Sequence, residues 1–252
     1  MSAVGERVER WGTLPSTNAR ALELAREGAE HGWVVVADAQ SSGRGQRGAS
    51  WHSPPGSGLY ASYLLRPKID AAHAPFLGLA AGVAVASAVR PWVGEAVGLK
   101  WPNDLLAREP PFEGRKLAGI LVESAIDADG LRHAVVGIGM NLRGAPEEIE
   151  PRAVSLEGLG VPPPETEVLL SALSKSLGDV LSVLELRDAE QVIRAWNARA
   201  LRLGAWVRVE AEGRRSEGVF RGLDADGAVV LEAKDGSRRS HAHGRIELWP
   251  RS

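Results

Sequence analysis

The chain has 252 residues, of which 44% are hydrophobic and 25% are charged, and its formal net charge at pH 7 is -2. That length allows one large domain, or a medium domain with a small appendix, and the composition is typical of a globular protein. The small net charge excludes a general attraction to nucleic acid or acidic membranes, and the lack of cysteine excludes disulfides, thiol catalysis and cysteine-bound zinc.

The N-terminal residues MSAVGERVERWG are charged and contain no apolar stretch, so we predict no signal peptide and a cytoplasmic protein. An amphipathic pattern then predicts a helix from Ser16 to about Gly28. Ser16 or Thr17 suits the N-cap, which is the structural interpretation of the Ser16-Thr17-Asn18 trio. The functional interpretation is that the three side chains hold a polar ligand, and both remain open.

A buried strand over residues 33–37 leads through Gln40 into a glycine-rich segment, residues 41–60. Its Gly43–Gly48 stretch matches G-x-G-x-x-G, but Trp51-His52-Ser53-Pro54-Pro55-Gly56 follows and cannot form the helix that a dinucleotide site requires. A P-loop is also excluded, because no G-K-[ST] closes the motif. The arginines among glycines indicate a phosphate-bearing ligand, so we predict a mobile loop that orders over it.

The next elements alternate with turns. We predict a helix over residues 74–89, ended near Pro91, and strands over residues 59–65, 97–101, 116–123 and 134–142. The helical run is too short for a bilayer and is interpreted as a buried core helix. Gly137 and Gly139 weaken the last strand, which often marks a ligand or backbone that comes close.

Two helical patterns follow, over residues 167–184 and 189–203. After Gly204 the sequence changes to short alternating patterns that are typical of strands. Short strands separated by glycine turns are predicted over residues 206–209, 216–223, 228–231, 237–241 and 245–248. They indicate a small β-barrel after a boundary near residue 203. The fold class is therefore α+β, with a larger domain over residues 1–203 and a β domain over residues 204–252.

Four motifs in order, GRGQRG-x-x-W, KWPND, GRKLAGILVES and VVGIGMNL, resemble the biotin protein ligase family (biotin–[acetyl-CoA carboxylase] ligases) over nearly the whole chain. Such enzymes join biotin to ATP as biotinyl-5′-AMP and pass the biotinyl group to one lysine of a biotin carboxyl carrier domain. The resemblance implies a class II synthetase-like mixed sheet flanked by helices, with an SH3-like C-terminal domain. It implies ATP, Mg²⁺ and biotin as ligands.

A carboxylate that attacks the α-phosphate builds negative charge, which cationic groups must neutralise. By resemblance, Lys116 and Arg44 take this catalytic role. The biotin site implied by the resemblance comprises Ser16, Thr17, Asn18, Gln40, Arg44, Gly45, Gln46, Lys116 and Gly119. The implied nucleotide site comprises Arg47, Trp51, Asn103, Asp104 and Asn141. Asp104 is the candidate Mg²⁺ ligand, although an ordinary turn explains it equally well, and Trp51 and Asn141 could equally be structural.

Two positions depart from the family pattern. Gln46 stands where family members commonly carry arginine or another residue, and glutamine cannot neutralise phosphate, so we expect normal formation but somewhat weaker retention of the adenylate. Arg245, in Gly244-Arg245-Ile246, replaces an acidic residue, so no function is carried onto it. Only 15 residues precede Ser16, which leads us to expect the form without the helix-turn-helix domain, with no binding of DNA and none of membranes.

Two other functions remain as alternatives. A lipoate or octanoate protein ligase would share the fold and acyl chemistry, but would need an apolar tunnel in place of the polar set. A non-catalytic RNA-binding module would rest on the arginine-glycine loop and the β-rich tail, and the net charge and the single aromatic near the loop speak against it. The strands near Leu142 could pair with a second copy, giving a homodimer, or with the acceptor domain.

Overall fold

The larger part of the protein is built on a seven-stranded mixed sheet with the strand order β1-β2-β3-β7-β6-β5-β4. The computed structural model describes residues 3–127, 130–144, 152–211 and 213–247. Strands β1 and β2 run parallel and the other neighbours are antiparallel. The strands are β1 (Arg7–Leu14), β2 (Trp33–Gln40), β3 (Gly58–Leu65), β4 (Val97–Lys100), β5 (Asp104–Ala107), β6 (Lys116–Asp127) and β7 (Gly130–Asn141). The predicted mixed sheet is confirmed.

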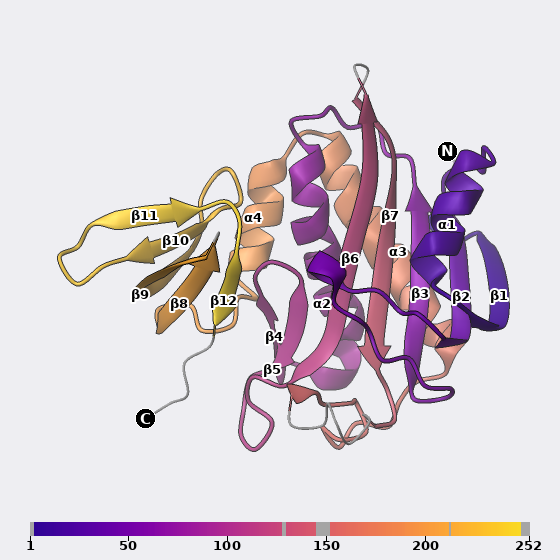
Figure 1. Ribbon diagram of the computed structural model, residues 1–252, viewed down its shortest axis with the longest axis horizontal. Helices are drawn as coiled ribbons and strands as arrows, with labels where there is room; N and C mark the ends of the chain where they lie inside the picture. Colours follow the sequence, from indigo (N-terminus) through magenta and orange to yellow (C-terminus); the bar gives the residue numbers. More distant parts are fainter. Residues whose placement is uncertain (1–2, 128–129, 145–151, 212, 248–252) are drawn as a thin grey trace.

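Helices cover both faces of this sheet (Figure 1). They are α1 (Thr17–Arg26), α2 (Leu77–Val93), α3 (Thr166–Glu185) and α4 (Ala189–Asn197). Because side chains alternate along a strand, Val35 of β2 packs with α1, while its neighbours Val34 and Val36 belong to the main core with α2 and α3. Helices thus cover much of both faces, while the face of β6 and β7 beside α1 is left for other segments of the chain to cover.

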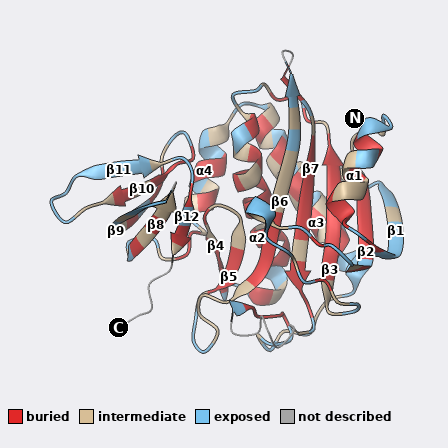
Figure 2. Cartoon of the chain, in the orientation of Figure 1, coloured by how far each residue is buried: buried red, intermediate tan, exposed pale blue. Residues whose placement is uncertain are grey.

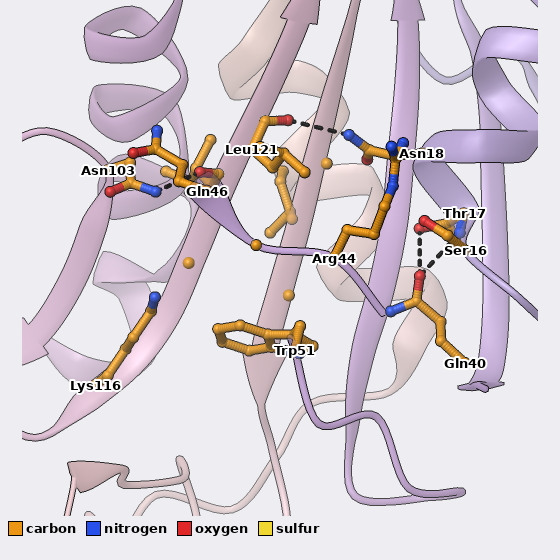
Figure 3. Close-up of a pocket in the computed structure, with 16 residues that line it drawn as sticks. Ser16, Thr17, Asn18, Gln40, Arg44, Gln46, Trp51, Asn103, Lys116 and Leu121 are labelled. Carbon is orange, nitrogen blue, oxygen red and sulfur yellow. Dashed lines mark hydrogen bonds between the residues drawn. The ribbon is translucent and has the colours of Figure 1, made fainter. Parts of the chain in front are cut away.

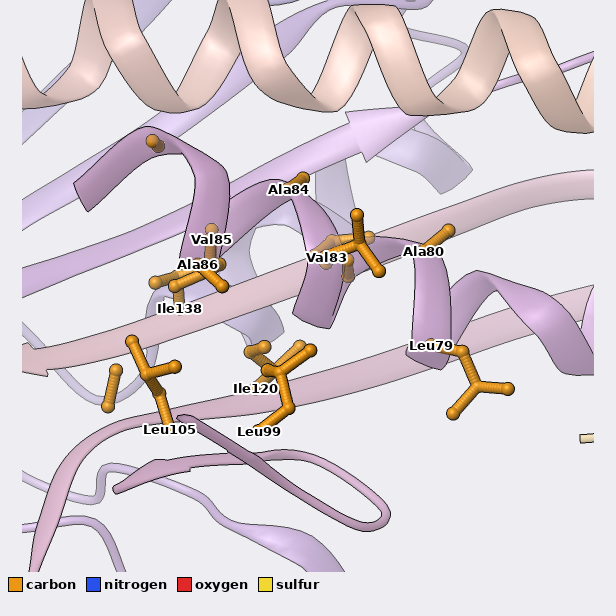
Figure 4. Packing of buried hydrophobic residues seen from close by; sticks show 14 of the residues in the cluster. Leu79, Ala80, Val83, Ala84, Val85, Ala86, Leu99, Leu105, Ile120 and Ile138 are labelled. Atoms are coloured by element: carbon orange, nitrogen blue, oxygen red, sulfur yellow. The ribbon is translucent and has the colours of Figure 1, made fainter. Parts of the chain in front are cut away.

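Helix α2 forms the centre of the core (Figure 4). With the short 3-10 turn η2 (Ala74–Phe76) it is long and apolar enough to cross a membrane, but it is largely buried inside the protein and is a core helix, as predicted. The helix ends at Val93, close to the predicted end near Pro91, and Pro91 lies inside its last turn. Pro91 faces solvent in the last turn, where the carbonyl it leaves unbonded can be hydrated.

The C-terminal part is a five-stranded antiparallel sheet of order β11-β10-β9-β8-β12, which confirms the predicted β domain. Its strands are β8 (Trp206–Ala211), β9 (Arg214–Leu223), β10 (Val229–Glu232), β11 (Arg238–His241) and β12 (Arg245–Glu247). Phe220 of β9 packs edge-on against Trp196 of α4, with ring centroids 6.5 Å apart. Arg202 and Glu113 form a 2.7 Å ion pair at the junction. One continuous apolar core thereby joins the two parts.

Three elements differ from the sequence prediction. Strand β1 was not predicted, because it is an edge strand whose side chains are mostly exposed and polar (Figure 2). Strand β5 was not predicted because it follows the Pro102-Asn103 turn directly and is only four residues long. Helix α4 ends at Asn197, short of the predicted residue 203, and the chain then pairs with β4 through Leu99 and Arg199.

Candidate active site

A cavity lies where the start of α1, the glycine-rich segment and the strands β6 and β7 meet (Figure 3). It brings together all but three of the predicted site residues. Its lining comprises Ser16, Thr17, Asn18, Gln40, Arg44, Gly45, Gln46, Trp51, Asn103, Lys116, Gly119, Ile120, Leu121, Gly137, Ile138 and Gly139. Residues from five segments of the chain therefore converge on one place.

The polar end of the cavity is built around Gln40, the last residue of β2. Its side-chain oxygen accepts from the backbone N–H of Thr17 at 2.8 Å and from the Thr17 hydroxyl at 3.1 Å. Its amide nitrogen donates to Ser53 Oγ at 2.8 Å. Ser16 caps α1 by accepting from Ala19 N–H, and it also lines the cavity. The capping and ligand-facing interpretations of Ser16 are thus compatible.

Asn18 is held by two residues that the sequence did not single out, Ser62 and Glu123. The Asn18 amide donates to Glu123 Oε2 at 2.8 Å, and Ser62 Oγ donates to Asn18 Oδ1 at 2.6 Å. A Cβ at Gly137 would lie 1.9 Å from Asn18 Oδ1, so the glycine makes room for this side chain. Ser62 lies inside an apolar strand, and Glu123 lies near the middle of a long strand. Neither position has a local sequence pattern that predicts a role in the site.

The glycine-rich segment forms a small hairpin over the cavity. Its Trp51 N–H donates to Gly43 O at 2.9 Å, and the 3-10 turn η1 (Gln46–Gly48) forms its tip. No helix follows η1, in agreement with the exclusion of a dinucleotide fold. Arg44 reaches from this hairpin to Glu123 at 2.7 Å and is about 42% exposed, so its charge sits at the mouth of the cavity.

Trp51, at the base of the hairpin, lines the cavity and packs against β6 and β7. A Cβ at Gly119 would lie 2.8 Å from the indole ring, and one at Gly139 would lie 2.4 Å from it. The glycines thus let the ring contact the backbone of β6 and β7. The indole N–H is buried and has no partner among the described residues. The remaining cavity measures about 40 Å³, against about 300–1,000 Å³ for pockets that hold small molecules, so side chains that line it must move before such a ligand fits.

The cationic end of the cavity is built around Lys116, the first residue of β6. Its Nζ lies 2.6 Å from Asp104 Oδ1 and 5.0 Å from the centre of the Trp51 ring. Lys100 Nζ lies 3.6 Å from the other oxygen of Asp104. Burial lowers the pKa of Lys100, and the Asp104 carboxylate partly opposes that shift. Lys116 is therefore a positioned group and not a solvated strand-end lysine.

Beyond Lys116 a second cleft, of about 860 Å³, runs between β4, β5 and the C-terminal sheet. Its lining comprises Lys100, Asp104, Leu106, Gly114, Lys116, Arg152, Arg208, Arg245, Ile246 and Glu247. Basic side chains outnumber acidic ones in it, so it suits an anion. Lys100, Arg152 and Arg208 were not predicted, because their role depends on how the C-terminal sheet packs.

The three predicted residues outside the first cavity are Arg47, Asp104 and Asn141. Asp104 borders the second cleft, as described above. The Asn141 amide donates to Lys116 O at 3.0 Å and to Val154 O at 3.3 Å, so it supports the strand that carries Lys116. The structure does not bring its side chain to the cavity. Arg47 points away, to Gly244 O at 2.9 Å.

The predicted Mg²⁺ site does not fit a metal held by the protein alone. Asp104 is a single carboxylate that two lysines already neutralise. Among the described residues no group of three or more His, Cys, Asp or Glu side chains could hold a metal ion. Mg²⁺ prefers carboxylate and phosphate oxygens, so any site here would depend on the phosphates of a ligand.

Two family models match the chain. Residues 12–141 match the Biotin/lipoate A/B protein ligase family, and residues 203–249 match the Biotin protein ligase C terminal domain. The biotin–[acetyl-CoA-carboxylase] ligase of Paracoccus denitrificans is 36% identical over 88% of this chain and 92% of its own length. The enzyme of the same name from Mycobacterium tuberculosis is 38% identical over 86% of this chain and 80% of its own.

A solved structure agrees with this relationship. The biotin protein ligase of Aquifex aeolicus in complex with biotin and ATP has a TM-score of 0.79 and 28% identity, with 96% of this chain and 98% of that one covered. The predicted resemblance is confirmed over both parts of the chain. This chain belongs to the biotin/lipoate A/B protein ligase family, and within it to the biotin protein ligases.

Proposed function

We propose that this protein is an ATP-dependent biotin protein ligase. It forms biotinyl-5′-AMP from biotin and ATP and then transfers the biotinyl group to one lysine of the biotin carboxyl carrier domain of acetyl-CoA carboxylase. The observation that carries the proposal is one cavity with a neutral polar end at Gln40 and a cationic end at Lys116. Location in the cytoplasm, the absence of DNA binding and a homodimer remain predictions.

The polar end suits the ureido ring of biotin, a small neutral group that needs both donors and acceptors. Thr17, Asn18 and Gln40 supply hydroxyl and amide groups, and Thr17 and Asn18 are about 96% buried by the protein around them. Leu121 lines the cavity with an apolar side chain that suits the acyl chain, while Ile120 and Ile138 border the cavity but belong to the main core with α2 (Figure 4). A lipoate or octanoate ligase has no comparable use for the buried amides, which favours biotin.

The first half-reaction joins a biotin carboxylate oxygen to the α-phosphorus of ATP and breaks the bond to the β-phosphate, which releases pyrophosphate. Negative charge grows at the α-phosphate, and Lys116 lies at the cationic end where it can neutralise it. Arg44 supplies a second positive charge at the mouth of the cavity. To do so it must leave Glu123 and bind the ligand. The basic cleft beyond Lys116 suits the departing phosphates.

In the second half-reaction the lysine amine of the carrier domain attacks the acyl carbon, AMP leaves with the bonding electron pair, and the amine loses a proton. The role of this chain is to hold the adenylate and keep water from it until the lysine arrives. Trp51 and the hairpin over the cavity are placed for that task. Mg²⁺ with ATP remains a prediction, and no step is assigned to it.

Exchange of pyrophosphate into ATP tests the proposal. We expect exchange that depends on biotin, and not on lipoate or octanoate. Lys116→Ala should lower its rate by about 100-fold or more, as for the loss of one donor to a charged transition state. Lys175→Ala is the matched control, because Lys175 lies on the exposed face of α3 and should leave exchange unchanged.

Two results would contradict the assignment. Exchange that needs lipoate, or that needs no acid at all, would exclude biotin as the substrate. Full biotin-dependent exchange in a folded Lys116→Ala protein would remove Lys116 from the catalytic group.

A further inference from the structure

The tip of the glycine-rich hairpin is bound to the C-terminal sheet through Arg47. Arg47 Nη2 donates to the carbonyl oxygen of Gly244 at 2.9 Å, across 197 residues of sequence. Gly244 lies in the turn between β11 and β12. This hydrogen bond from a charged donor to a carbonyl spans the two parts of the protein.

Both partners have a positive φ, which is strained for Arg47 and allowed for Gly244. Arg47 has φ 56° and ψ 34°, the left-handed region that costs a non-glycine residue about 1 kcal/mol or more. Gly244 has φ 133°, and a Cβ there would lie 2.5 Å from Glu210 O. Such a conformation persists only where surrounding contacts hold it, and the bond to Gly244 is one of them for Arg47.

The C-terminal sheet is a firm anchor for this bond. Arg245, the first residue of β12, follows Gly244 and pairs with Glu210 of β8 at 2.5 Å. Ile246 of β12 is buried in the continuous core that joins the two parts. The Arg47 guanidinium also helps to lower the pKa of Glu210, behind the larger effect of Arg245. The hairpin tip thus meets a surface that is itself fixed.

Hydrogen bonds within the hairpin connect its tip, which carries Arg47, to its base at the cavity. Gly45 N–H donates to Ala49 O and Trp51 N–H donates to Gly43 O, so the tip and the base are one hydrogen-bonded unit. Arg44 and Trp51 lie at the base, and both line the cavity. Holding Arg47 therefore restricts the hairpin backbone that carries Arg44 and Trp51, while their side chains can still rotate to admit a ligand.

We infer that Arg47 is a positioning residue through which the C-terminal sheet holds the hairpin closed over the acyl-adenylate. The inference rests on the proposed function, and it replaces the direct contact with the nucleotide that the family resemblance implied for Arg47. The C-terminal sheet then helps to retain the acyl-adenylate, although none of its residues lines the first cavity.

Three variants separate this role from a general effect on the hairpin. Arg47→Asn keeps a residue that tolerates the left-handed region but cannot reach Gly244. Arg47→Lys keeps the charge and the donor and should largely restore the wild-type behaviour. Arg239→Asn, on the exposed face of β11, is the matched control.

Hydrogen exchange of residues 43–51 in the full-length protein without ligands is the first measurement, because it does not depend on the reaction. We expect about tenfold faster exchange in Arg47→Asn than in wild type, Arg47→Lys or Arg239→Asn, from the loss of a charge-assisted bond. Equal protection in all four proteins would overturn the inference. A wild-type protein that formed no adenylate would instead refute the proposed function and leave this comparison intact.

Release of biotinyl-5′-AMP from preloaded enzyme is the second measurement. The release rate should rise about tenfold in Arg47→Asn. Gly244→Ala, which displaces the turn, should give a similar rise, and the double variant should be no faster than either single one. Additive effects, or release at the wild-type rate in Arg47→Asn, would show that the two residues do not act through this bond.

Discussion

At the residue scale, the site depends on neutral amides and hydroxyls whose partners come from distant strands. Gln40 orients Thr17, and Ser62 with Glu123 orients Asn18. The bond between Ser62 and Asn18 is buried and the other two are partly buried, where an unmatched polar group is costly, so the geometry is well specified. The residue types were predictable, and their partners were not.

Gln46 gives the first prediction at this scale. It lines the cavity but carries no charge, so it binds a phosphate less strongly than arginine would. Gln46→Arg should slow the escape of biotinyl-5′-AMP by about tenfold, measured by release from preloaded enzyme. Gln191→Arg, on exposed α4, adds the same charge far from the cavity and should change nothing. An unchanged escape rate in Gln46→Arg would refute the weaker retention that we expect.

At the element scale, strands β6 and β7 form a surface on which other side chains pack directly against the backbone. Their glycines make this possible because they have no side chain. Gly119 and Gly139 admit the Trp51 ring, and Gly137 admits Asn18. Glycine weakens a strand, so three glycines in two neighbouring strands indicate that close packing of other groups on these strands outweighs the loss. The sequence did predict a close approach at Gly137 and Gly139, but which side chain approached depended on the packing of α1 and the hairpin.

Gly137→Ala tests this surface. The added Cβ would overlap the Asn18 amide, which Ser62 and Glu123 hold in place, so the KM for biotin should rise about tenfold or more. Gly78→Ala in α2, where nothing lies within 4 Å, should leave that KM unchanged and keep or raise stability. Steady-state kinetics with thermal melts separate the two effects. An unchanged KM in folded Gly137→Ala would contradict the role of Asn18.

At the scale of the whole molecule, the two parts share one core and meet around the candidate site. Phe220 on Trp196 and the Arg202–Glu113 pair fix the C-terminal sheet against α4 and the loop before β6. That placement completes the basic cleft and brings Gly244 to Arg47. The β domain is therefore expected to unfold together with the larger part, and not as an independent unit.

Stability should also depend on pH through half-buried histidines. Burial lowers the pKa of His133, and the charges of Arg66, Arg132 and Arg26 lower it further. Burial likewise lowers the pKa of His31 and His241. Above about pH 6.5 the histidines are neutral in both states, and below it the unfolded chain binds protons first, so the free energy of unfolding falls.

Denaturant unfolding between pH 7 and pH 5 measures this effect. His133→Gln should make the loss of stability with falling pH smaller than in wild type, while the remaining histidines keep part of it. The carboxylates with lowered pKa, such as Glu9 and Glu232, lose their contribution only at more acidic pH. The same pH slope in both proteins would contradict the assignment to His133.

The sequence by itself determined the family, the mixed α+β class, the β-rich tail and most residues of the cavity. It could do so because each motif combines residue types with a local spacing, and strands such as β6 and helices such as α3 follow from periodicity. The tertiary structure alone decided which residues meet. Glu123 reaches Arg44 across 79 residues and Gly244 reaches Arg47 across 197, distances over which spacing carries no information. Those contacts depend on strand order and on the packing of the C-terminal sheet, which no local pattern encodes.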